Sequence, residues 1–327
     1  DGPNAFLLTL PLACLFIARA LDGFTGGNIA VANAYMADIS NDENRGENFG
    51  QMSASMSLAF VLGPALAGLL STTILEELLP VLVAAVISLV TMLLIQLWLK
   101  ETIDLPPNPT RPRRILSRFF GQAHKSCRNP DTRRAKLKDL LQLENIPLMF
   151  LLYLMVFLSF SLFYVGFPVY SSQVLGWSAK ELGGFLAISS LIMFGVNTYG
   201  IKYLNRYTGP RQLMLSGAIL MAISFALLTL DNFFALAAAN VLLSVGNGVL
   251  WPSFMSVLSE SSPPDKIGGI MGWGNSMGSL GSILGLLIGG FLYTHIGPRL
   301  FFLGSLLFLT VFILILFYFG NQNKAMD

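Results

Sequence analysis

Charged residues are scarce in this chain. Asp, Glu, Lys and Arg make up 12% of the 327 residues, whereas 54% are hydrophobic and the mean hydropathy is +0.65. A water-soluble domain carries about 25% charged residues. Because a chain of this length could not hide so much apolar surface from water, we expect lipid to be its solvent.

Histidine and cysteine are also rare, with two of each. Cys14 lies in an apolar run and Cys127 in a basic one, so no disulfide framework is predicted. An intramembrane enzyme would need a buried constellation such as His with Ser or Asp, but His124 falls in a polar connector and His295 near the edge of a span. The sequence shows no metal-ligand spacing and no phosphate-binding loop, so we predict neither a metal nor another cofactor.

Long apolar stretches are abundant instead. About 20 apolar residues cross the hydrocarbon of a bilayer as a helix, and the chain has nine stretches of that kind. The first lacks the basic start and the small-residue cleavage site of a signal peptide. The sequence therefore predicts an all-α membrane protein with spans at about 9–37, 48–71, 78–99, 147–170, 180–204, 211–230, 233–258, 268–293 and 299–320.

Lysine and arginine are distributed unevenly around these spans. On the alternating topology, 17 of the 20 fall on one side, 11 of them in the connector at residues 100–146. Positive charge marks the cytoplasmic side, so we expect a multi-pass protein of the cell membrane with the connector and the C-terminus in the cytoplasm. This bias explains the basic charge without nucleic acid as a partner. The connector could lie on the anionic membrane surface or form a solvated linker.

One pattern of small residues occurs twice. Residues 50–70 and 272–292 match with a constant offset of 222 positions, as in the pairs Gly50 with Gly272, Gly63 with Gly285, and Gly68 with Gly290. Two copies of one helix indicate an internally duplicated transporter with its substrate path between the halves. We expect residues 48–99 and 268–320 to superpose about an axis along the membrane normal.

The connector divides the chain unequally, into residues 1–99 with three spans and 147–327 with six. Shifting residues 147–230 back by 222 positions gives numbers that lie almost wholly before Asp1. We therefore expect nine of twelve spans to be present, with about three missing from the N-terminus of a six-plus-six parent of roughly 400 residues. A genuine nine-helix protein is the alternative.

The segment from Arg19 to Gln51 resembles the fourth span and following loop of the major facilitator superfamily. Arg19 and Gly23 match the arginine motif of that span, and Asp38 with Arg45 and Gly46 is similar to the loop after it. In the second half, the loop from Gly200 to Arg211 is similar to another loop of the family, with Asn205 where an acid is expected.

Residues 50–68 resemble the fifth-span signature of drug:proton antiporters of the tetracycline-efflux type, with Ala59 and Ala67 in place of glycines. The resemblance implies a major facilitator type helical bundle and transport by antiport, which favours export. It assigns a conformational role to Asp38, Arg45, Gly46, Gly63, Pro64 and Gly68. A packing kink without a role in coupling is the alternative for Gly63 and Pro64.

Arg19 is the basic residue that lies well inside a span, and Asp22 is the carboxylate that does so. A charge at that depth costs about 2.5–3.5 kcal/mol or more, so it usually faces a wet cavity or a partner. The spacing of three places both side chains on one helix face. Near the 222 offset the second half carries no charge, which argues against a purely structural pair. We predict that Arg19 and Asp22 couple transport to protons, and a neutralised pair that packs helices is the alternative.

Polar and aromatic side chains within the spans form the candidate pocket. An amide in a bilayer needs a partner or water, and aromatic surface suits flat apolar compounds. The predicted substrate-binding residues are Asn28, Asn33, Tyr164, Asn197, Asn247 and Trp251. A helix–helix contact is the alternative for each. The glycines of the eighth span, Gly274, Gly278, Gly281, Gly285 and Gly289, are predicted to be a packing strip.

Together these features predict a secondary active transporter that exports a small amphipathic organic compound or drug in exchange for protons by alternating access. Its expected partners are the small-molecule substrate, the proton and the lipid bilayer. The first alternative is an uptake carrier or facilitator for a sugar or metabolite with the same fold. An intramembrane enzyme is the second alternative, which the histidine positions disfavour.

Overall fold

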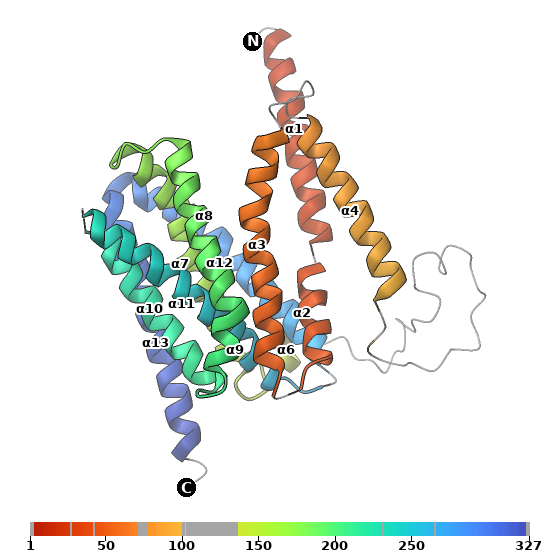
Figure 1. Ribbon diagram of the computed structural model, residues 1–327, viewed down its shortest axis with the longest axis vertical. Coiled ribbons are helices and arrows are strands. Elements are labelled where there is room, and N and C mark those ends of the chain that lie inside the picture. The colour runs from red at the N-terminus through yellow and green to blue at the C-terminus, as the bar shows by residue number, and fades with distance from the viewer. Residues whose placement is uncertain are drawn as a thin grey trace, which may run out of the picture.

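The computed structural model describes residues 3–26, 28–41, 43–70, 78–99, 102, 137–230, 232–264 and 266–324. These residues form helices joined by turns, and no strand occurs among them (Figure 1). The all-helical fold predicted from the sequence is therefore confirmed. Residues 103–136 of the basic connector lie outside the described part, so the two alternatives for the connector stay open.

Helices coincide with all nine predicted spans. The first half contains α1 (Pro3–Thr25), α2 (Asn28–Asp38), α3 (Arg45–Leu70) and α4 (Leu78–Trp98). The second half begins with the short α6 (Leu137–Leu140) and continues with α7 (Ile146–Gln173), α8 (Ala179–Gly195), the π-helical turn η2 (Val196–Gly200), α9 (Ile201–Leu204), α10 (Pro210–Leu227), α11 (Phe233–Glu260), α12 (Ile267–Ile296), the 3-10 turn η3 (Gly297–Arg299) and α13 (Leu300–Lys324).

Six stretches of the described chain are long and apolar enough to cross a membrane, judged by length and composition. They cover seven of the predicted spans, because the last stretch, Ile267–Phe317, runs through both α12 and α13. The first predicted span is helical but interrupted. Its break lies between Thr25 and Asn28, where the Gly26 amide donates to Gly23 O and the Asn28 side chain accepts from the Ile29 amide.

Local sequence explains where several helices begin. Ser178 precedes α8, and its amide donates to the Glu181 carboxylate at 2.7 Å, which satisfies one of the free donors of the first turn. Asn232 caps α11 by accepting from the Phe234 amide at 2.8 Å. Pro210 occupies the first turn of α10, where a missing amide hydrogen costs nothing.

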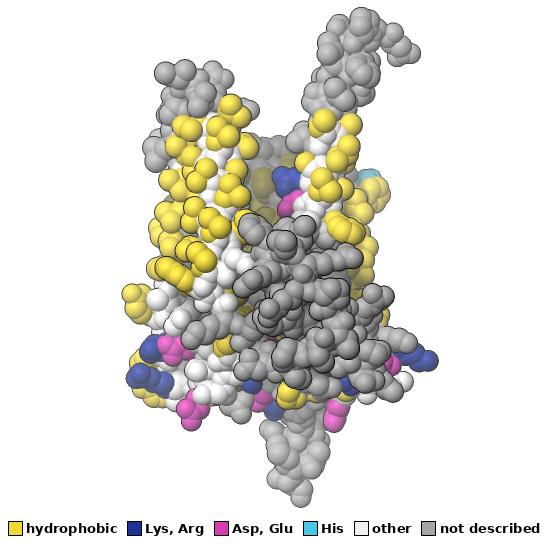
Figure 2. Space-filling model, turned by 90° about the vertical axis from the view of Figure 1, so that its right-hand side faces the viewer, with side chains coloured by type: hydrophobic (Ala, Val, Ile, Leu, Met, Phe, Trp, Pro, Cys, Tyr) yellow, Lys and Arg dark blue, Asp and Glu magenta, His cyan; other side chains and the backbone are white. Residues whose placement is uncertain are grey.

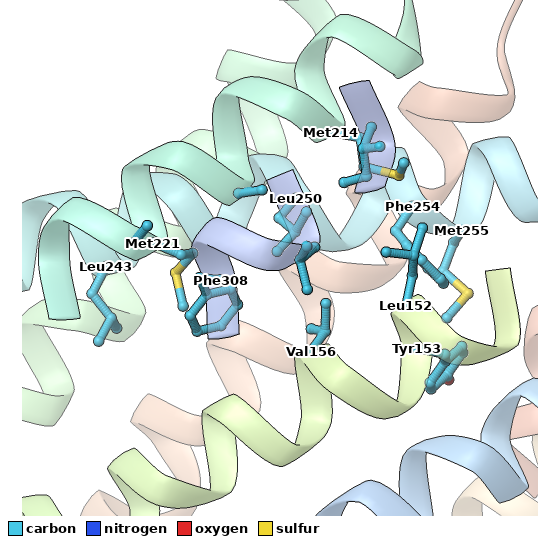
Figure 3. Close-up of a cluster of buried hydrophobic side chains, with 14 of the residues drawn as sticks. Leu152, Tyr153, Val156, Met214, Met221, Leu243, Leu250, Phe254, Met255 and Phe308 are labelled. Atoms are coloured by element: carbon cyan, nitrogen blue, oxygen red, sulfur yellow. The ribbon is translucent and has the colours of Figure 1, made fainter. Parts of the chain in front are cut away.

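The helices α7 to α13 pack into a bundle with a continuous apolar core. In Figure 3, side chains from four helices converge on this core. Several are fully buried, and those labelled are Leu152, Tyr153 and Val156 of α7, Met214 and Met221 of α10, Leu243, Leu250, Phe254 and Met255 of α11, and Phe308 of α13. The division of the chain into a three-span unit and a six-span unit stays a prediction.

Glycines let helices of this bundle approach closely. The predicted packing strip is confirmed, because its five glycines are buried and face α7. A Cβ atom at Gly285 would lie 2.6 Å from both Leu158 O and the Cβ of Ser161. Likewise, a Cβ at Gly217 of α10 would lie 2.8 Å from the backbone of Leu250 in α11. Small residues at such interfaces allow backbone-to-backbone contact, which is the main source of attraction between helices in lipid.

The 222-residue offset reappears in the helix boundaries. Adding 222 to Arg45 gives 267, the first residue of α12, and adding it to Leu78 gives 300, the first residue of α13. Adding 222 to Asp38 gives 260, where α11 ends. The contact of α3 with α11 and that of α12 with α2 are thus images of each other under the repeat. This agreement supports the duplication, and superposition of the two copies stays a prediction.

The two halves meet at one end of the molecule, which is the lower end in Figure 1. The buried residues of α3 all lie between Phe49 and Ser57, and from Leu58 onwards none of its described side chains is buried. All described side chains of α1 before the break are exposed, whereas α2 buries Asn33 and Ala37. We call the end where the halves meet the closed end and the opposite end the open end. Figure 2 shows charged side chains gathered round the closed end, below a broad hydrophobic surface.

Packing along α12 predicts that two of its glycines differ in how much stability a larger side chain removes. Gly285→Val should force α12 away from Leu158 and lower the free energy of unfolding by about 1–3 kcal/mol, the usual cost of overpacking. Gly290→Val is the matched control, because the nearest atom to its Cβ, in Val165, is 4.0 Å away. Thermal unfolding in detergent measures both. Equal melting temperatures for the two variants would show that α7 and α12 are not packed as described.

Candidate functional site

The first half of α3 packs against the continuous helical segment made of α8, η2 and α9, near the end where η2 and α9 lie. Gly50 makes this approach possible, since a Cβ there would lie 3.0 Å from Asn197 O and 3.2 Å from the side chain of Ile201. Closer to the end, Gly46 lies against the side chain of Asn205. We call this surface the closed-end contact. Gly46 was predicted as part of a loop motif, and the structure places it between the halves.

Two polar interactions cross the closed-end contact. Lys202 Nζ donates to Glu47 Oε1 at 2.7 Å, and Asn197 Nδ2 donates to Ser57 Oγ at 3.3 Å. The ion pair is partly exposed, and such pairs contribute about 0–1 kcal/mol. Asn197 Oδ1 is buried without a hydrogen-bond partner among the described residues, and such an oxygen costs about 1–3 kcal/mol. Apolar packing adds to these interactions, because Phe49 of α3 is fully buried and belongs to the main apolar core.

A π-helical turn lies at the centre of this contact. Residues Val196–Gly200 form the turn, which inserts an extra residue into the helix and is most often found at functional sites. Val196 packs against α11, since a Cβ at Gly248 would lie 3.0 Å from Val196 Cγ1. The next residue, Asn197, contacts α3. One turn therefore connects the rigid bundle to the other half.

A second contact joins α2 to α12. Asn33 is 2% exposed there, and its Oδ1 also lacks a hydrogen-bond partner among the described residues. Asp38, the last residue of α2, accepts a hydrogen bond from Thr102 Oγ1 at 3.0 Å. Arg45 begins α3 in the same region. The three loop-motif residues Asp38, Arg45 and Gly46 are thus gathered at the closed end, although their role in conformational change is untested.

The remaining motif residues lie in the part of α3 near the open end. Gly63 has no atom within 4 Å of its Cβ position, so it does not serve close packing among the described residues. Pro64 and Gly68 lie in the same helix, but their side-chain surroundings are outside the described part. Their predicted role in coupling stays a prediction.

Arg19 and Asp22 share one face of α1, as predicted. Arg19 Nη1 lies 3.8 Å from Asp22 Oδ2. Their side chains are 84% and 76% exposed, so the described helices do not enclose the pair. Opposite charges at this spacing partly neutralise each other, which lowers the cost of placing both in a membrane. The structure leaves their coupling role untested.

The second half uses neutral polar groups in the equivalent place. Adding 222 to Asp22 gives 244, and Ser244 is fully buried next to Asn240 on α11. The Ser189 hydroxyl of α8 donates to Asn240 Oδ1, and Asn240 Nδ2 donates to Phe185 O at 3.3 Å. Polar groups therefore occur in both copies of this helix, and in the second half they join α8 to α11.

The six predicted substrate-binding residues do not form one pocket. Asn28 begins α2 and bonds its neighbouring amide, while Asn33 and Asn197 are buried in contacts between the halves. These three assignments receive no support, because the sequence does not show which face of a helix meets another helix. Asn247 donates to the sulfur of Met193 at 3.6 Å and thus contacts α8.

Trp251 belongs to an aromatic cluster at the junction of α7 and α11. Its ring lies 5.3 Å from Tyr153 and 5.2 Å from Phe157, both roughly perpendicular to it, and stacks 6.1 Å from Phe254. Sequence analysis missed Tyr153, Phe157 and Phe254. Helical spacing could have found two of them, because Tyr153, Phe157, Phe160 and Tyr164 recur every three or four residues along one face of α7.

Tyr164 lies farther along the same face of α7, toward the open end. It is 54% exposed, and its ring contacts Phe160 at 5.5 Å and Phe163 at 6.1 Å. Exposure thus increases along the row from the buried Tyr153 to Tyr164. Such a row offers π surfaces to an aromatic or apolar ligand.

A small cavity lies elsewhere, at the open end. Its volume is about 130 Å³, and its lining includes Tyr170, Trp177, Asn232 and Phe233. Ligand pockets usually measure about 300–1,000 Å³, so this one is too small for a drug-sized compound. It contains none of the predicted site residues. Among the described residues, no group of three or more potential metal ligands occurs.

Comparisons with known proteins place this geometry in a family. A model of the Major Facilitator Superfamily matches residues 4–208 and 201–326. An uncharacterized MFS-type transporter of Bacillus subtilis (strain 168), YttB, is 32% identical over 113 residues, which are 34% of this chain and 28% of that protein. The multidrug resistance protein MdtH of Proteus mirabilis (strain HI4320) is 26% identical over 137 residues, 41% of this chain and 34% of the relative.

The matched segments span about a third or less of the length of these curated relatives. Among solved structures, the crystal structure of the human organic anion transporter MFSD10 (TETRAN) aligns with a TM-score of 0.76. The alignment covers 93% of this chain and 71% of that one, at 22% sequence identity. At that identity the likeness shows a shared fold and nothing about the substrate.

The closed-end contact predicts sensitivity at Gly50. Gly50→Val should separate α3 from Asn197 and Ile201, because the added methyl groups have no room. In a variant with Cys14→Ser and Cys127→Ser, a cysteine introduced at the buried Ser57 should then react about tenfold faster with a maleimide.

Gly195→Val is the matched control, since no atom lies within 4 Å of that Cβ position. It should leave the labelling rate at Ser57→Cys unchanged. Equal rates for Gly50→Val and the parent would contradict the described contact.

Proposed function

Since the chain belongs to the Major Facilitator Superfamily, we propose that it exports a small amphipathic organic compound in exchange for protons by alternating access. The observation that carries this proposal is the contact of the two halves at one end alone. The family is one of transporters, and the alternative of an intramembrane enzyme is dropped.

The confinement of the contact between the halves to the closed end supports alternating access. A transporter of this kind must open at one membrane face while it is closed at the other, so its closing contacts cannot be strong. The buried apolar core lies mostly in the second half and reaches the first half through Ala37 and Phe49, beside one partly exposed ion pair and a few polar groups. The halves can therefore move as separate bodies about the space between them.

The charge distribution supports an orientation for this state. The helix starts and turns at the closed end carry Arg45, Arg206, Arg211 and Lys266, and the connector follows α4 at the same end. Positive charge marks the cytoplasmic side. The closed end then faces the cytoplasm, and the conformation described is open to the outside.

The aromatic cluster of α7 and α11 supports an amphipathic substrate. Trp251 and Phe157 are half-buried, and the aromatic row of α7 continues from them toward the open end. Asn247 lies one helical turn from Trp251 on the same face and supplies a polar group. The name of the relative MdtH, a multidrug resistance protein, agrees with such a substrate, although its identity to this chain is low.

Proton exchange is assigned to the Arg19–Asp22 pair. Asp22 is a carboxylate that can carry a proton, and the Arg19 guanidinium lies 3.8 Å from it. Protonation coupled to opening would then link the proton gradient to export.

A substitution at Arg19 tests the coupling. In the full-length protein, the Arg19→Ala variant should insert into the membrane normally but lose proton-driven export. The Arg19→Lys variant should retain part of the export activity, because the positive charge remains. Export is measured with inverted membrane vesicles across a range of pH. An unchanged rate and pH profile in Arg19→Ala would make the arginine structural, and accumulation in the opposite direction would favour an uptake carrier.

The orientation has its own test. A cysteine introduced at Ser117 in the connector, with Cys14 and Cys127 replaced by serine, should react with a membrane-impermeant maleimide only after the cells are opened. A cysteine at Gly176, in the loop between α7 and α8, should react in intact cells. The reverse pattern would place the closed end outside.

A further inference from the structure

Three tyrosines project from the outer surface of the helical segment that forms the closed-end contact. Tyr199, Tyr203 and Tyr207 are 73%, 61% and 72% exposed, although each is a large side chain in an apolar protein. They recur every four residues, so they form one row near the end of that segment. The rings of Tyr203 and Tyr207 lie 5.2 Å apart. We call this row the tyrosine strip.

The strip continues an apolar surface that faces lipid. Farther along α8, the apolar side chains of Ile188 and Leu191 are 55% and 54% exposed. Buried groups of the same helix, such as Ser189 and Asn197, face α11 and α3 instead. Tyrosine is enriched where the hydrocarbon gives way to headgroups. Tyr199 and Tyr203 are separated by about 6 Å along the helix, close to the depth of one headgroup layer.

The charge of this segment selects the kind of lipid. Residues 196–212 contain Lys202, Arg206 and Arg211 but no acidic residue. Lys202 is paired with Glu47, whereas the Arg206 side chain is exposed next to Tyr207. An exposed guanidinium beside phenol hydroxyls can donate several hydrogen bonds to a phosphate group. Anionic lipids of the inner leaflet provide such groups and attract basic residues.

We propose that the tyrosine strip and Arg206 bind an anionic phospholipid headgroup, and that the bound lipid stabilises the closed-end contact. Lipid binding and the closed-end contact are linked because η2 and α9 form a short segment that takes part in both. Asn197, Ile201 and Lys202 contact α3 from one side of η2 and α9, while the strip occupies the other side. A lipid that holds the strip in place reduces the freedom of this turn to leave α3. The inference uses the proposed orientation to name the leaflet, and it does not depend on the substrate.

The test uses the full chain in vesicles of two compositions, dioleoylphosphatidylcholine alone or mixed with dioleoylphosphatidylglycerol. The first readout is the lipid retained after gentle extraction, measured by native mass spectrometry. The second is the maleimide labelling rate of Ser57→Cys with Cys14→Ser and Cys127→Ser. We expect preferential retention of phosphatidylglycerol and labelling slower on the order of fivefold, the factor that one basic residue gains near an anionic surface.

The variants separate the strip from general lipid effects. Tyr199→Leu combined with Tyr203→Leu and Arg206→Gln should abolish both differences, and the single exposed change Arg206→Gln should reduce them without disturbing the fold. The control is Phe233→Leu with Phe234→Leu, two side chains at the open end that are 75% and 80% exposed. The control should keep both differences.

Three results would overturn the proposal. Equal retention of the two lipids in the parent removes the binding site. Preferential retention without slower labelling removes the link to the closed-end contact. Slower labelling that persists in the strip variant means that the lipid acts elsewhere. Neither readout measures transport, so the proposal can fail or succeed independently of the export function.

Discussion

Close approach of helix backbones is the constraint on which the bundle depends. In lipid, every backbone polar group must be satisfied within the protein, which makes helices obligatory, and burial of apolar side chains gives little attraction between them. Association must then come from contact area and from polar groups. Gly285 against Leu158 and Gly217 against Leu250 provide that contact inside the second half. Larger residues at these positions would separate the helices and remove most of the dispersion energy that holds them.

Close backbone contact at glycines also occurs between the halves, but at fewer positions. Gly50 brings α3 to the backbone of Asn197, where the apolar side chains of Phe49 and Ile201 lie beside an amide oxygen of Asn197 that has no hydrogen-bond partner among the described residues. A dry, well-packed interface would be too stable to open in each transport cycle. An interface with an unpaired amide oxygen and a partly exposed ion pair recovers part of its energy on separation, because water can replace the lost bonds. The difference between the two kinds of interface therefore follows from the need for one to persist and the other to separate.

The positions of the helices could be predicted from the sequence, but which face of each helix packs against another helix could not. Apolar length located all nine spans, and the spacing of Gly278, Gly281 and Gly285 correctly indicated packing, because both signals are local. The pocket assignments of Asn33 and Asn197 stay predictions, because a polar residue in a span satisfies the same rule in a pocket or in a contact between helices, and both side chains are buried. Only the arrangement of α2 against α12 and of α3 against η2 decides between these environments. The π-helical turn at Val196–Gly200 was equally invisible, since no residue type marks it.

The repeat connects the candidate coupling pair to the rest of the fold. Asp22 and Ser244 are separated by the same offset that relates α3 to α12, so the predicted duplication assigns both to one position of a repeated helix. In the second half that position holds a neutral network in which Ser189 and Asn240 join α8 to α11, and its bonds persist at any pH. In the first half it holds two ionisable groups, whose interaction depends on protonation. A duplicated fold can thus keep one copy of a polar helix contact as a permanent support. The other copy, with titratable side chains, becomes the place where a proton could change how the helices pack.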